Sequence, residues 1–149
     1  MQLTLFSLAK ALSELVAPSA VFDPSKVFVG VASAIANNGV NTTLADVTPA
    51  TGSVAPLQEV TTFSAPYLTK TGLEVVDSGV LKFSPSTVAD AQTVANWYLC
   101  DALTDGNLLG FGSLNPAVPL LGPQSVLSFV LRLTLDPAGT WDASVQWDD

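Results

Sequence analysis

The stretch VLSFVLRLTLDPAGTWDASVQW, from Val126 to Trp147, contains two segments in which apolar and polar residues alternate. In the first segment, every second residue is a large apolar one: Leu127, Phe129, Leu131, Leu133 and Leu135. Successive side chains of a β-strand point to opposite faces, so these five residues share one face. The pattern predicts a strand whose Leu and Phe side chains face a core.

The second segment alternates as well and places Trp141, Ala143, Val145 and Trp147 on one face. Each aromatic side chain can bury about 150–250 Å², which is too much apolar area for a loose chain end. The Pro-Ala-Gly sequence at 137–139 interrupts the chain, so the segment either turns back as a hairpin partner or adds to a neighbouring subunit's sheet edge. Both alternatives stay open, and Trp141, Val145 and Trp147 are candidate interface residues.

Outward from this stretch, further short segments rich in β-branched and aromatic residues are separated by turn residues. They are Lys26–Ala34, Leu57–Phe63, Tyr67–Asp77, Gly79–Ser84 and Ala95–Ala102. A Gly-, Asn-, Thr- and Pro-rich segment over 37–56 reads as a long loop. Roughly eight strands with regular turn signals indicate a mainly β protein, a jelly-roll or related antiparallel β-sandwich.

The N-terminal segment has a different period. Leu5, Leu8 and Leu12 recur at helical spacing, and Pro18 ends the pattern. We predict a short amphipathic helix over 1–17, with these leucines as further interface candidates. The 149 residues fit one domain, made of this helix, a β-sandwich over 26–136 and a C-terminal strand within 137–149 that is a possible subunit contact.

Few residues of this chain are charged, and most of the charged residues are acidic. Charged residues form 12% of the sequence, against about 25% in typical soluble domains, while hydrophobic residues form 48%. A surface built from small uncharged residues is easily desolvated, so we expect a homo-oligomer, a trimer before a dimer. The net charge of -8 and the five scattered cations disfavour nucleic acid and anionic membranes as partners.

The residue inventory disfavours an enzyme. The chain has no histidine and one cysteine, Cys100, so neither a Ser-His-Asp nor a Cys-His arrangement can form. Four carboxylates, Glu59, Glu74, Asp77 and Asp101, could in principle pair as in a glycosidase, but their spacing selects no pair. We therefore expect no catalytic residue, no cofactor and no metal.

The segment WYLCDALTDGNLLGFGSL, from Trp97 to Leu114, places an acidic loop between two apolar runs. Its Asp-Gly-Asn sequence at 105–107 tolerates positive φ and predicts a hairpin between Ala95–Ala102 and Leu108–Leu114. A calcium site is the alternative, but the loop lacks the acidic series of an EF-hand. Gly110 and Gly112 precede no helix, so we expect them to relieve crowding or form a bulge.

Several short motifs in these strands carry a family resemblance. They are Tyr67–Lys70, Gly79–Phe83, Trp97–Ala102, Asp105–Leu109, Leu114 and Val126–Phe129. Together they resemble a family of small structural proteins of tailed bacteriophages, variously described as tail-fibre-like or head decoration proteins. The resemblance covers about Val27 to Asp136, with Lys70 standing where the family often has Arg. It implies a jelly-roll β-sandwich and no catalytic residues.

The function that this resemblance implies is a virion structural protein, most simply a decoration or cement protein that binds the major capsid protein on the outer head surface. An acidic protein inside the head would face DNA of the same charge, which favours the outside. A tail or neck component is the alternative within this class. The competing class is a jelly-roll carbohydrate-binding module, for which Trp97, Trp141 and Trp147 are the candidate stacking residues.

Overall fold

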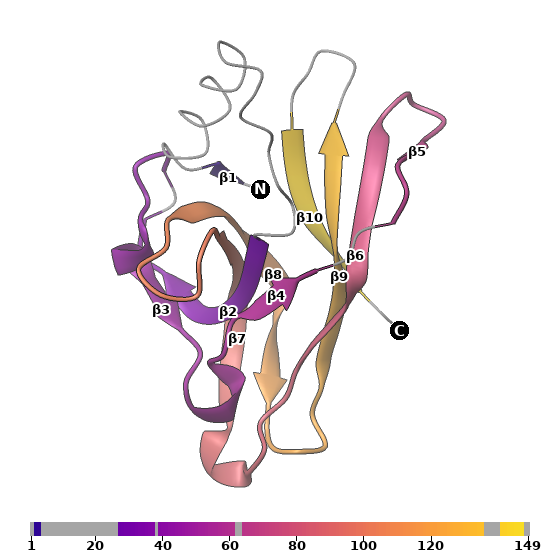
Figure 1. Ribbon diagram of the computed structural model, residues 1–149. Coiled ribbons are helices and arrows are strands. Elements are labelled where there is room, and N and C mark those ends of the chain that lie inside the picture. The colour runs from indigo at the N-terminus through magenta and orange to yellow at the C-terminus, as the bar shows by residue number, and fades with distance from the viewer. Residues whose placement is uncertain (1, 4–26, 38, 62–63, 136–140, 148–149) are drawn as a thin grey trace.

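The computed structural model describes residues 2–3, 27–37, 39–61, 64–135 and 141–147, and these form a mainly β protein with two antiparallel sheets (Figure 1). The first sheet has, in spatial order, β1 (Gln2–Leu3), β8 (Leu108–Leu120), β7 (Gln92–Cys100), β2 (Val27–Ile35) and β3 (Val47–Pro49). β4 (Gln58–Val60) also pairs with β2. The second sheet has the order β10 (Trp141–Trp147), β9 (Leu127–Leu135), β6 (Glu74–Phe83) and β5 (Tyr67–Leu68).

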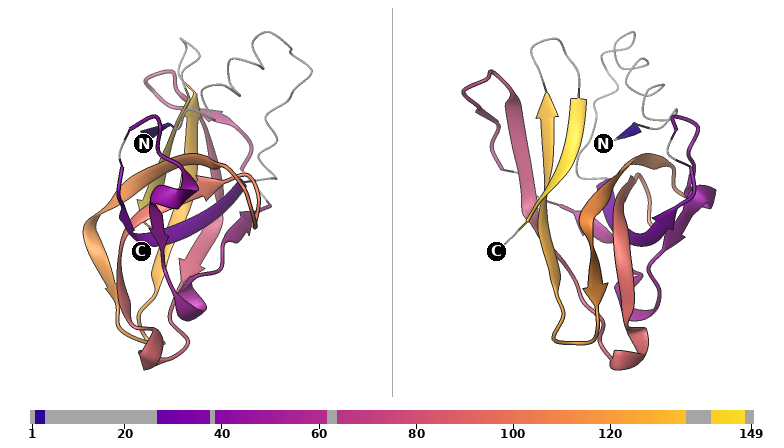
Figure 2. Two further views of the ribbon diagram at one scale, coloured as in Figure 1. Left: turned by 90° about the vertical axis from the view of Figure 1, so that its left-hand side faces the viewer. Right: turned by 180° about the vertical axis from the view of Figure 1, so that it is seen from behind.

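The two sheets lie face to face and enclose one hydrophobic core (Figures 1 and 2). The first sheet contributes Val29, Trp97 and Leu120, and the second contributes Leu131 and Phe129, all almost completely buried. A layered pair of sheets is the arrangement that hides the apolar faces of alternating strands. The predicted class, a mainly β protein with antiparallel sheets, is confirmed for the described residues.

The predicted faces of β9 are confirmed where side chains are described. Leu127, Phe129, Leu131 and Leu133 are exposed by no more than 7%. β9 lies between β6 and β10 and pairs with both, so it is an inner strand of its sheet. A strand with a neighbour on each side and a core on one face is fixed in register, because a slip by one residue would turn its apolar side chains outward.

In this structure, the C-terminal strand is a hairpin partner within its own chain. β10 pairs antiparallel with β9 from Trp141 opposite Leu135 to Trp147 opposite Phe129. Ala143 is buried in the core, and Val145 packs against it. The intrachain alternative is therefore the one that the structure shows, and β10 completes one side of the second sheet.

The N-terminus departs from the prediction at its first residues. Gln2 and Leu3 form β1, which lies antiparallel to β8 opposite Phe111 and Gly110. Pairing with the free edge of β8 satisfies backbone groups that a helix would satisfy internally, so the predicted helix over 1–17 is wrong at these two positions. The remainder of that helix, including Leu5, Leu8 and Leu12, lies outside the described residues.

The segment predicted as a long loop over 37–56 has structure of its own. It contains two short 3-10 helices, η2 (Leu44–Asp46) and η3 (Gly52–Val54), with β3 between them. Together with Leu57 it packs on the outer face of the first sheet, where Val47, Tyr98 and Phe111 belong to a second apolar cluster. The first sheet therefore carries apolar side chains on both faces.

Phe129 provides a test of the core. Its side chain is fully buried and stacks on Phe83 with 5.8 Å between ring centroids. Phe129→Ala should lower the free energy of unfolding by about 3–5 kcal/mol, because it leaves a cavity between the sheets. Urea denaturation measures this loss. Val126→Ala, at a position that is 52% exposed, is the control and should change stability by less than about 0.5 kcal/mol. Equal effects of the two substitutions would contradict the described core.

Candidate interaction surfaces

One end of the sandwich carries a cluster of exposed aliphatic side chains, which we call the apolar tip: Val88, Leu121 and Val126. Their exposed fractions are 73%, 66% and 52%. Val88 begins η4 (Val88–Asp90), and the other two residues flank the turn between β8 and β9. The two segments are adjacent, because a Cβ built on Gly122 would lie 3.4 Å from a Val88 methyl.

Hydrogen bonds hold the turn under the tip in place. Ser125 donates its backbone N–H to the Gly122 carbonyl at 2.9 Å, and its hydroxyl accepts from the Leu121 N–H at 3.1 Å. The Ser84 hydroxyl donates to the Ser125 carbonyl at 2.8 Å and ties the turn to the end of β6. These hydrogen bonds therefore fix the conformation of the turn, whose flanking aliphatic side chains are exposed to solvent.

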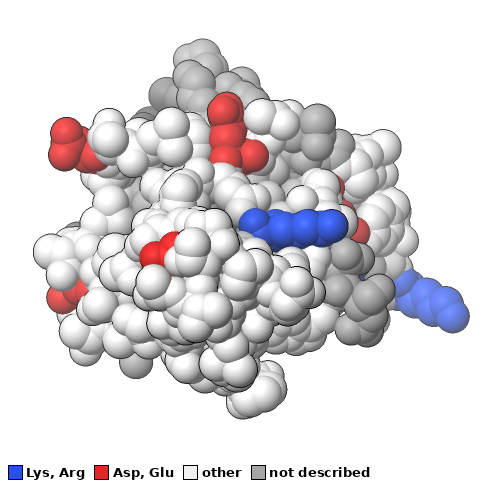
Figure 3. Space-filling model, turned by 90° about the horizontal axis from the view of Figure 1, so that it is seen from below, with Lys and Arg blue, Asp and Glu red and all other residues white. Residues whose placement is uncertain are grey.

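The surface around this end is mostly uncharged. Figure 3 views the molecule from below and shows isolated Lys, Arg, Asp and Glu side chains on a largely uncharged background. Exposed apolar residues scattered singly are normal, but neighbouring ones on an uncharged surface mark interaction sites more often than chance. Sequence reasoning missed this tip, because η4 and the β8–β9 turn are far apart along the chain.

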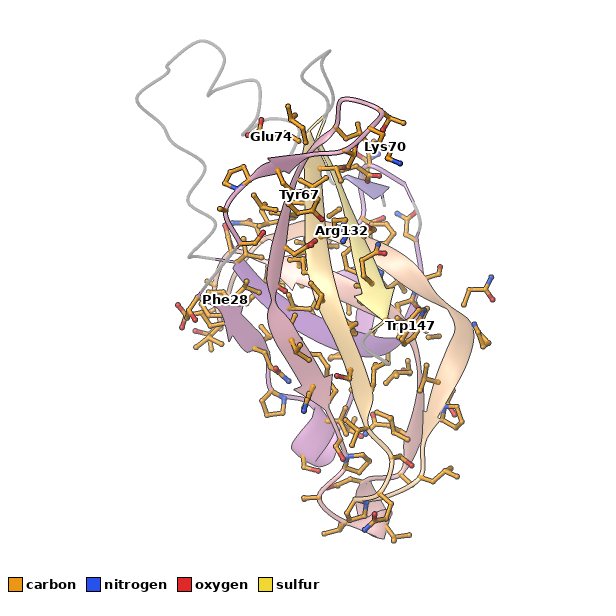
Figure 4. The ribbon with its side chains drawn as sticks, turned by 90° about the vertical axis from the view of Figure 1, so that its right-hand side faces the viewer. Phe28, Tyr67, Lys70, Glu74, Arg132 and Trp147 are labelled. Atoms are coloured by element: carbon orange, nitrogen blue, oxygen red, sulfur yellow. The ribbon has the colours of Figure 1, made fainter. Side chains whose placement is uncertain are left out.

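The second candidate surface is the side of the second sheet formed by β10. Trp147 lies at the end of this strand and is 47% exposed, whereas Val145 is half-buried against the core (Figure 4). Trp141 is the first residue of β10, but its side chain is outside the described part. Among the predicted interface residues, Trp147 is thus the one for which the structure shows a large exposed apolar surface.

A charged cluster occupies the outer face of the second sheet. The Arg132 Nε donates to Asp77 Oδ1 at 2.7 Å and its Nη2 to Asp77 Oδ2 at 3.1 Å, while the Tyr67 hydroxyl donates to Asp77 Oδ2 at 3.0 Å (Figure 4 shows Tyr67 and Arg132). The Arg132 hydrogen bonds lower the pKa of Asp77, partial burial opposes this, and Tyr67 adds to it. The cluster joins β5, β6 and β9, so its role is structural.

The acidic loop between β7 and β8 is a hairpin turn, as predicted. Asp105 has a φ of 52°, in the left-handed region. The Asn107 backbone N–H donates to Asp101 Oδ1 at 2.6 Å and its side-chain amide to Asp101 Oδ2 at 3.0 Å. A Cβ on Gly106 would approach the Ala102 carbonyl to 2.8 Å, which explains the glycine. Both oxygens of Asp101 are used within the loop, so the calcium alternative has no support here.

A small apolar pocket of about 220 Å³ lies on the outer face of the first sheet. Leu44, Leu57 and Leu103 line it together with Tyr98 and Cys100. Burial raises the pKa of Tyr98 to about 12 and that of Cys100 to about 12, the charge of Asp101 adding to the latter. Small-molecule sites usually measure about 300–1,000 Å³, so this pocket is smaller than a usual ligand site.

The carbohydrate-binding alternative loses one of its three stacking candidates. Trp97 is 3% exposed, and a Cβ on Gly112 would lie 2.6 Å from its ring. The missing side chain of Gly112 therefore makes room for a core tryptophan, as expected for a glycine that relieves crowding. An aromatic platform for a sugar needs an exposed ring, so Trp97 is excluded from that role.

Two of the four candidate carboxylates are engaged in hydrogen bonds, and the other two lie on strands of different sheets. Asp77 is paired with Arg132, and Asp101 accepts hydrogen bonds from Asn107. Glu59 lies on β4 of the first sheet, whereas Glu74 lies on β6 of the second. Within the described residues, no three His, Cys, Asp or Glu side chains are grouped as metal ligands. No helix in this described part is long and apolar enough to cross a membrane.

The pH dependence of stability tests the Asp77 cluster. Because the folded-state pKa of Asp77 is lowered, its pairing stabilises the protein above the unfolded pKa of about 3.9 and is lost as the pH falls through the lower folded value. Arg132→Met should cost about 1 kcal/mol near neutral pH and should flatten the fall in stability below about pH 4. Urea denaturation across this pH range measures both effects. Lys82→Met is the control, and an unchanged pH profile in Arg132→Met would contradict the assignment.

The reactivity of the single thiol tests the packing around the pocket. With a pKa of about 12, Cys100 carries little thiolate at pH 8 in the folded protein. Labelling by a disulfide reagent should be about a thousandfold slower in the folded protein than in urea, where the thiol pKa returns to about 8.5. Similar rates in the two states would show that the outer face of the first sheet is open.

Neither a scan against protein-family models nor a search of curated proteins found a match to this chain. The resemblance to phage structural proteins therefore rests on the short motifs quoted above, and function has to be argued from the surfaces of the molecule.

Proposed function

We propose that this chain is a non-enzymatic structural protein of a virus particle, a decoration or cement protein that binds the outer surface of a tailed-phage head. The observation that carries the proposal is the apolar tip, a cluster of exposed aliphatic side chains beside a hydrogen-bonded turn at one end of a sparsely charged sandwich. The motif resemblance supplies the class of particle.

The tip is suited to contact with a protein shell. The tip exposes apolar surface of Val88, Leu121 and Val126. Burying such surface at a contact is favourable by about 25 cal/mol for each Å² removed from water. Protein interfaces have such apolar centres with few charges and a polar rim. In this proposal, the tip contacts the major capsid protein, and the rest of the sandwich projects outward.

The overall charge supports an outer position. A net charge of -8 on 149 residues would repel packaged DNA, whereas the outer face of the shell imposes no such repulsion. The cations Lys82 and Arg132 are separate along the chain, and Arg132 is engaged by Asp77. A basic strip that could follow a nucleic-acid backbone is not part of the described surface.

The strand order supports the jelly-roll part of the proposal in one respect. β7 and β8 pair in the first sheet while β6 and β9, which flank them in sequence, pair in the second. Such nested pairs, alternating between sheets, are how a jelly roll is wound. β10 departs from that winding, because it stays beside β9 in the second sheet.

Self-association is part of the same proposal. A trimer fits a local three-fold site on a shell, and the amphipathic pattern of the N-terminus favours further contacts. A tail or neck component remains the alternative within the class. The carbohydrate-binding module is disfavoured by the burial of Trp97.

The number of copies per particle tests the location. We expect quantitative mass spectrometry of purified heads, emptied of DNA and separated from tails, to find the protein at a copy number that matches the capsomers. Recovery only with the tail fraction would contradict the decoration role and support the tail alternative.

Two aspartate substitutions test the tip on such heads. Leu121→Asp should weaken binding of the added protein to heads that lack it by roughly tenfold or more, because a charge would have to be buried at the contact. Leu103→Asp, at an exposed leucine on the β7–β8 turn, is the matched control and should bind normally. Equal binding of both variants would show that the tip is not the attachment surface.

A further inference from the structure

The hydroxyl of Tyr98 is buried and has no hydrogen-bond partner among the residues that the structure describes. Tyr98 is 5% exposed, and its side chain takes part in none of the hydrogen bonds of this part of the chain. Buried tyrosine hydroxyls usually have a partner, and one without a partner in the protein needs an explanation, such as a bound molecule. The chain's other tyrosine, Tyr67, donates its hydroxyl to Asp77.

The hydroxyl end of Tyr98 lies at the small apolar pocket on the outer face of the first sheet, which we call the Tyr98 pocket. Gly30 of β2 lies opposite Tyr98 of β7, and a Cβ built on Gly30 would lie 2.5 Å from Tyr98 Cζ and 2.6 Å from a Leu57 methyl. The ring therefore extends over Gly30, and its Cζ, which carries the hydroxyl, lies beside Leu57. Tyr98 and Leu57 both line the pocket of about 220 Å³. The unpartnered hydroxyl is thus at the wall of a cavity.

The other lining residues set the chemistry that a ligand of this pocket needs. Burial raises the pKa of Tyr98 and of Cys100 to about 12, so at neutral pH both are protonated and each has a hydrogen to donate. A molecule in the pocket therefore needs an acceptor for the Tyr98 hydroxyl. Most of the remaining lining is apolar: Leu44, Val47, Pro49, Leu57, Ala102 and Leu103.

Charge restricts the ligand to a neutral molecule. Asp105 is the one charged residue among the described residues that line the pocket, and it is exposed on the β7–β8 turn. An anion would be repelled by this carboxylate. An ion of either sign would also have to leave water for an apolar interior, which is costly without a buried partner charge.

We infer that the Tyr98 pocket binds a small neutral molecule with an apolar body of about the size of one ring and a single hydrogen-bond acceptor, such as a carbonyl oxygen. The acceptor pairs with the Tyr98 hydroxyl, and the apolar body contacts the leucines of the lining, Leu44 and Leu57 among them. An apolar cavity of about 150 Å³ is large enough to bind benzene, so about 220 Å³ accommodates such a body.

This site is separate from the surface proposed to bind heads. The apolar tip consists of Val88, Leu121 and Val126, and none of these residues lines the Tyr98 pocket. The ligand site therefore does not depend on the proposed function, and each of the two is tested without the other.

Two rings that differ in one oxygen test the site. Cyclohexanone carries the acceptor and cyclohexane lacks it, and each is titrated into the full-length protein while amide resonances are followed by two-dimensional NMR. Both should cause saturable shifts at Tyr98, Ala102 and Gly106. Tyr98→Phe keeps the aromatic ring but removes the hydroxyl. It should weaken cyclohexanone binding by about two- to tenfold, the effect of one hydrogen bond, and leave cyclohexane binding unchanged.

Tyr67→Phe is the matched control, because it removes the chain's other tyrosine hydroxyl, which lies outside the pocket, and should leave both affinities unchanged. Thermal unfolding of each variant confirms that the fold is retained. Absence of saturable shifts at the pocket with either ring would overturn the inference. So would a Tyr98→Phe variant that binds cyclohexanone as tightly as the unchanged protein, since the hydroxyl would then be paired by water rather than by the ligand.

Discussion

The structure depends on the burial of one face of β9. Its four described inward side chains, Leu127, Phe129, Leu131 and Leu133, fill the space between the sheets, and both edges of the strand are occupied by β6 and β10. Because the register of an inner strand with one buried face cannot slip, β9 fixes the positions of its two neighbours. The bulge in β6 is accommodated on this strand as well, since the Leu131 N–H donates to the Ser78 hydroxyl.

The same arrangement explains where the molecule can meet partners. The first sheet is covered on its inner face by the core and on part of its outer face by the segment that carries Val47 and Leu57. The edge of β6 is covered by the Ser64 region. The apolar tip and Trp147, at the end of β10, are two apolar features of the described surface that stay exposed. The proposed assembly role rests on these exposed apolar surfaces rather than on a group of reactive side chains.

The parts of the fold that sequence could predict are those decided by local alternation. β9 and β10 show this pattern because water lies on one side of the second sheet and the core on the other. The hairpin at Asp105 was predictable from turn chemistry. The outer cluster around Tyr98 and Phe111 was not, because its covering segment comes from a distant part of the chain and reads as a loop. The burial of Trp97 was not predictable either, because it depends on Gly112, which lies opposite it on β8. The apolar tip forms where η4 meets the β8–β9 turn, and these two segments are far apart along the chain.

Hydrogen exchange followed residue by residue tests the central claim, that β9 anchors the sandwich. Amides of β9 should exchange only through global unfolding, since the strand pairs with β6 on one side and β10 on the other. Amides of the 44–61 segment, which lies at the edge of the first sheet, should exchange faster through local opening. Exchange of β9 through local opening at rates like those of that segment would contradict the account.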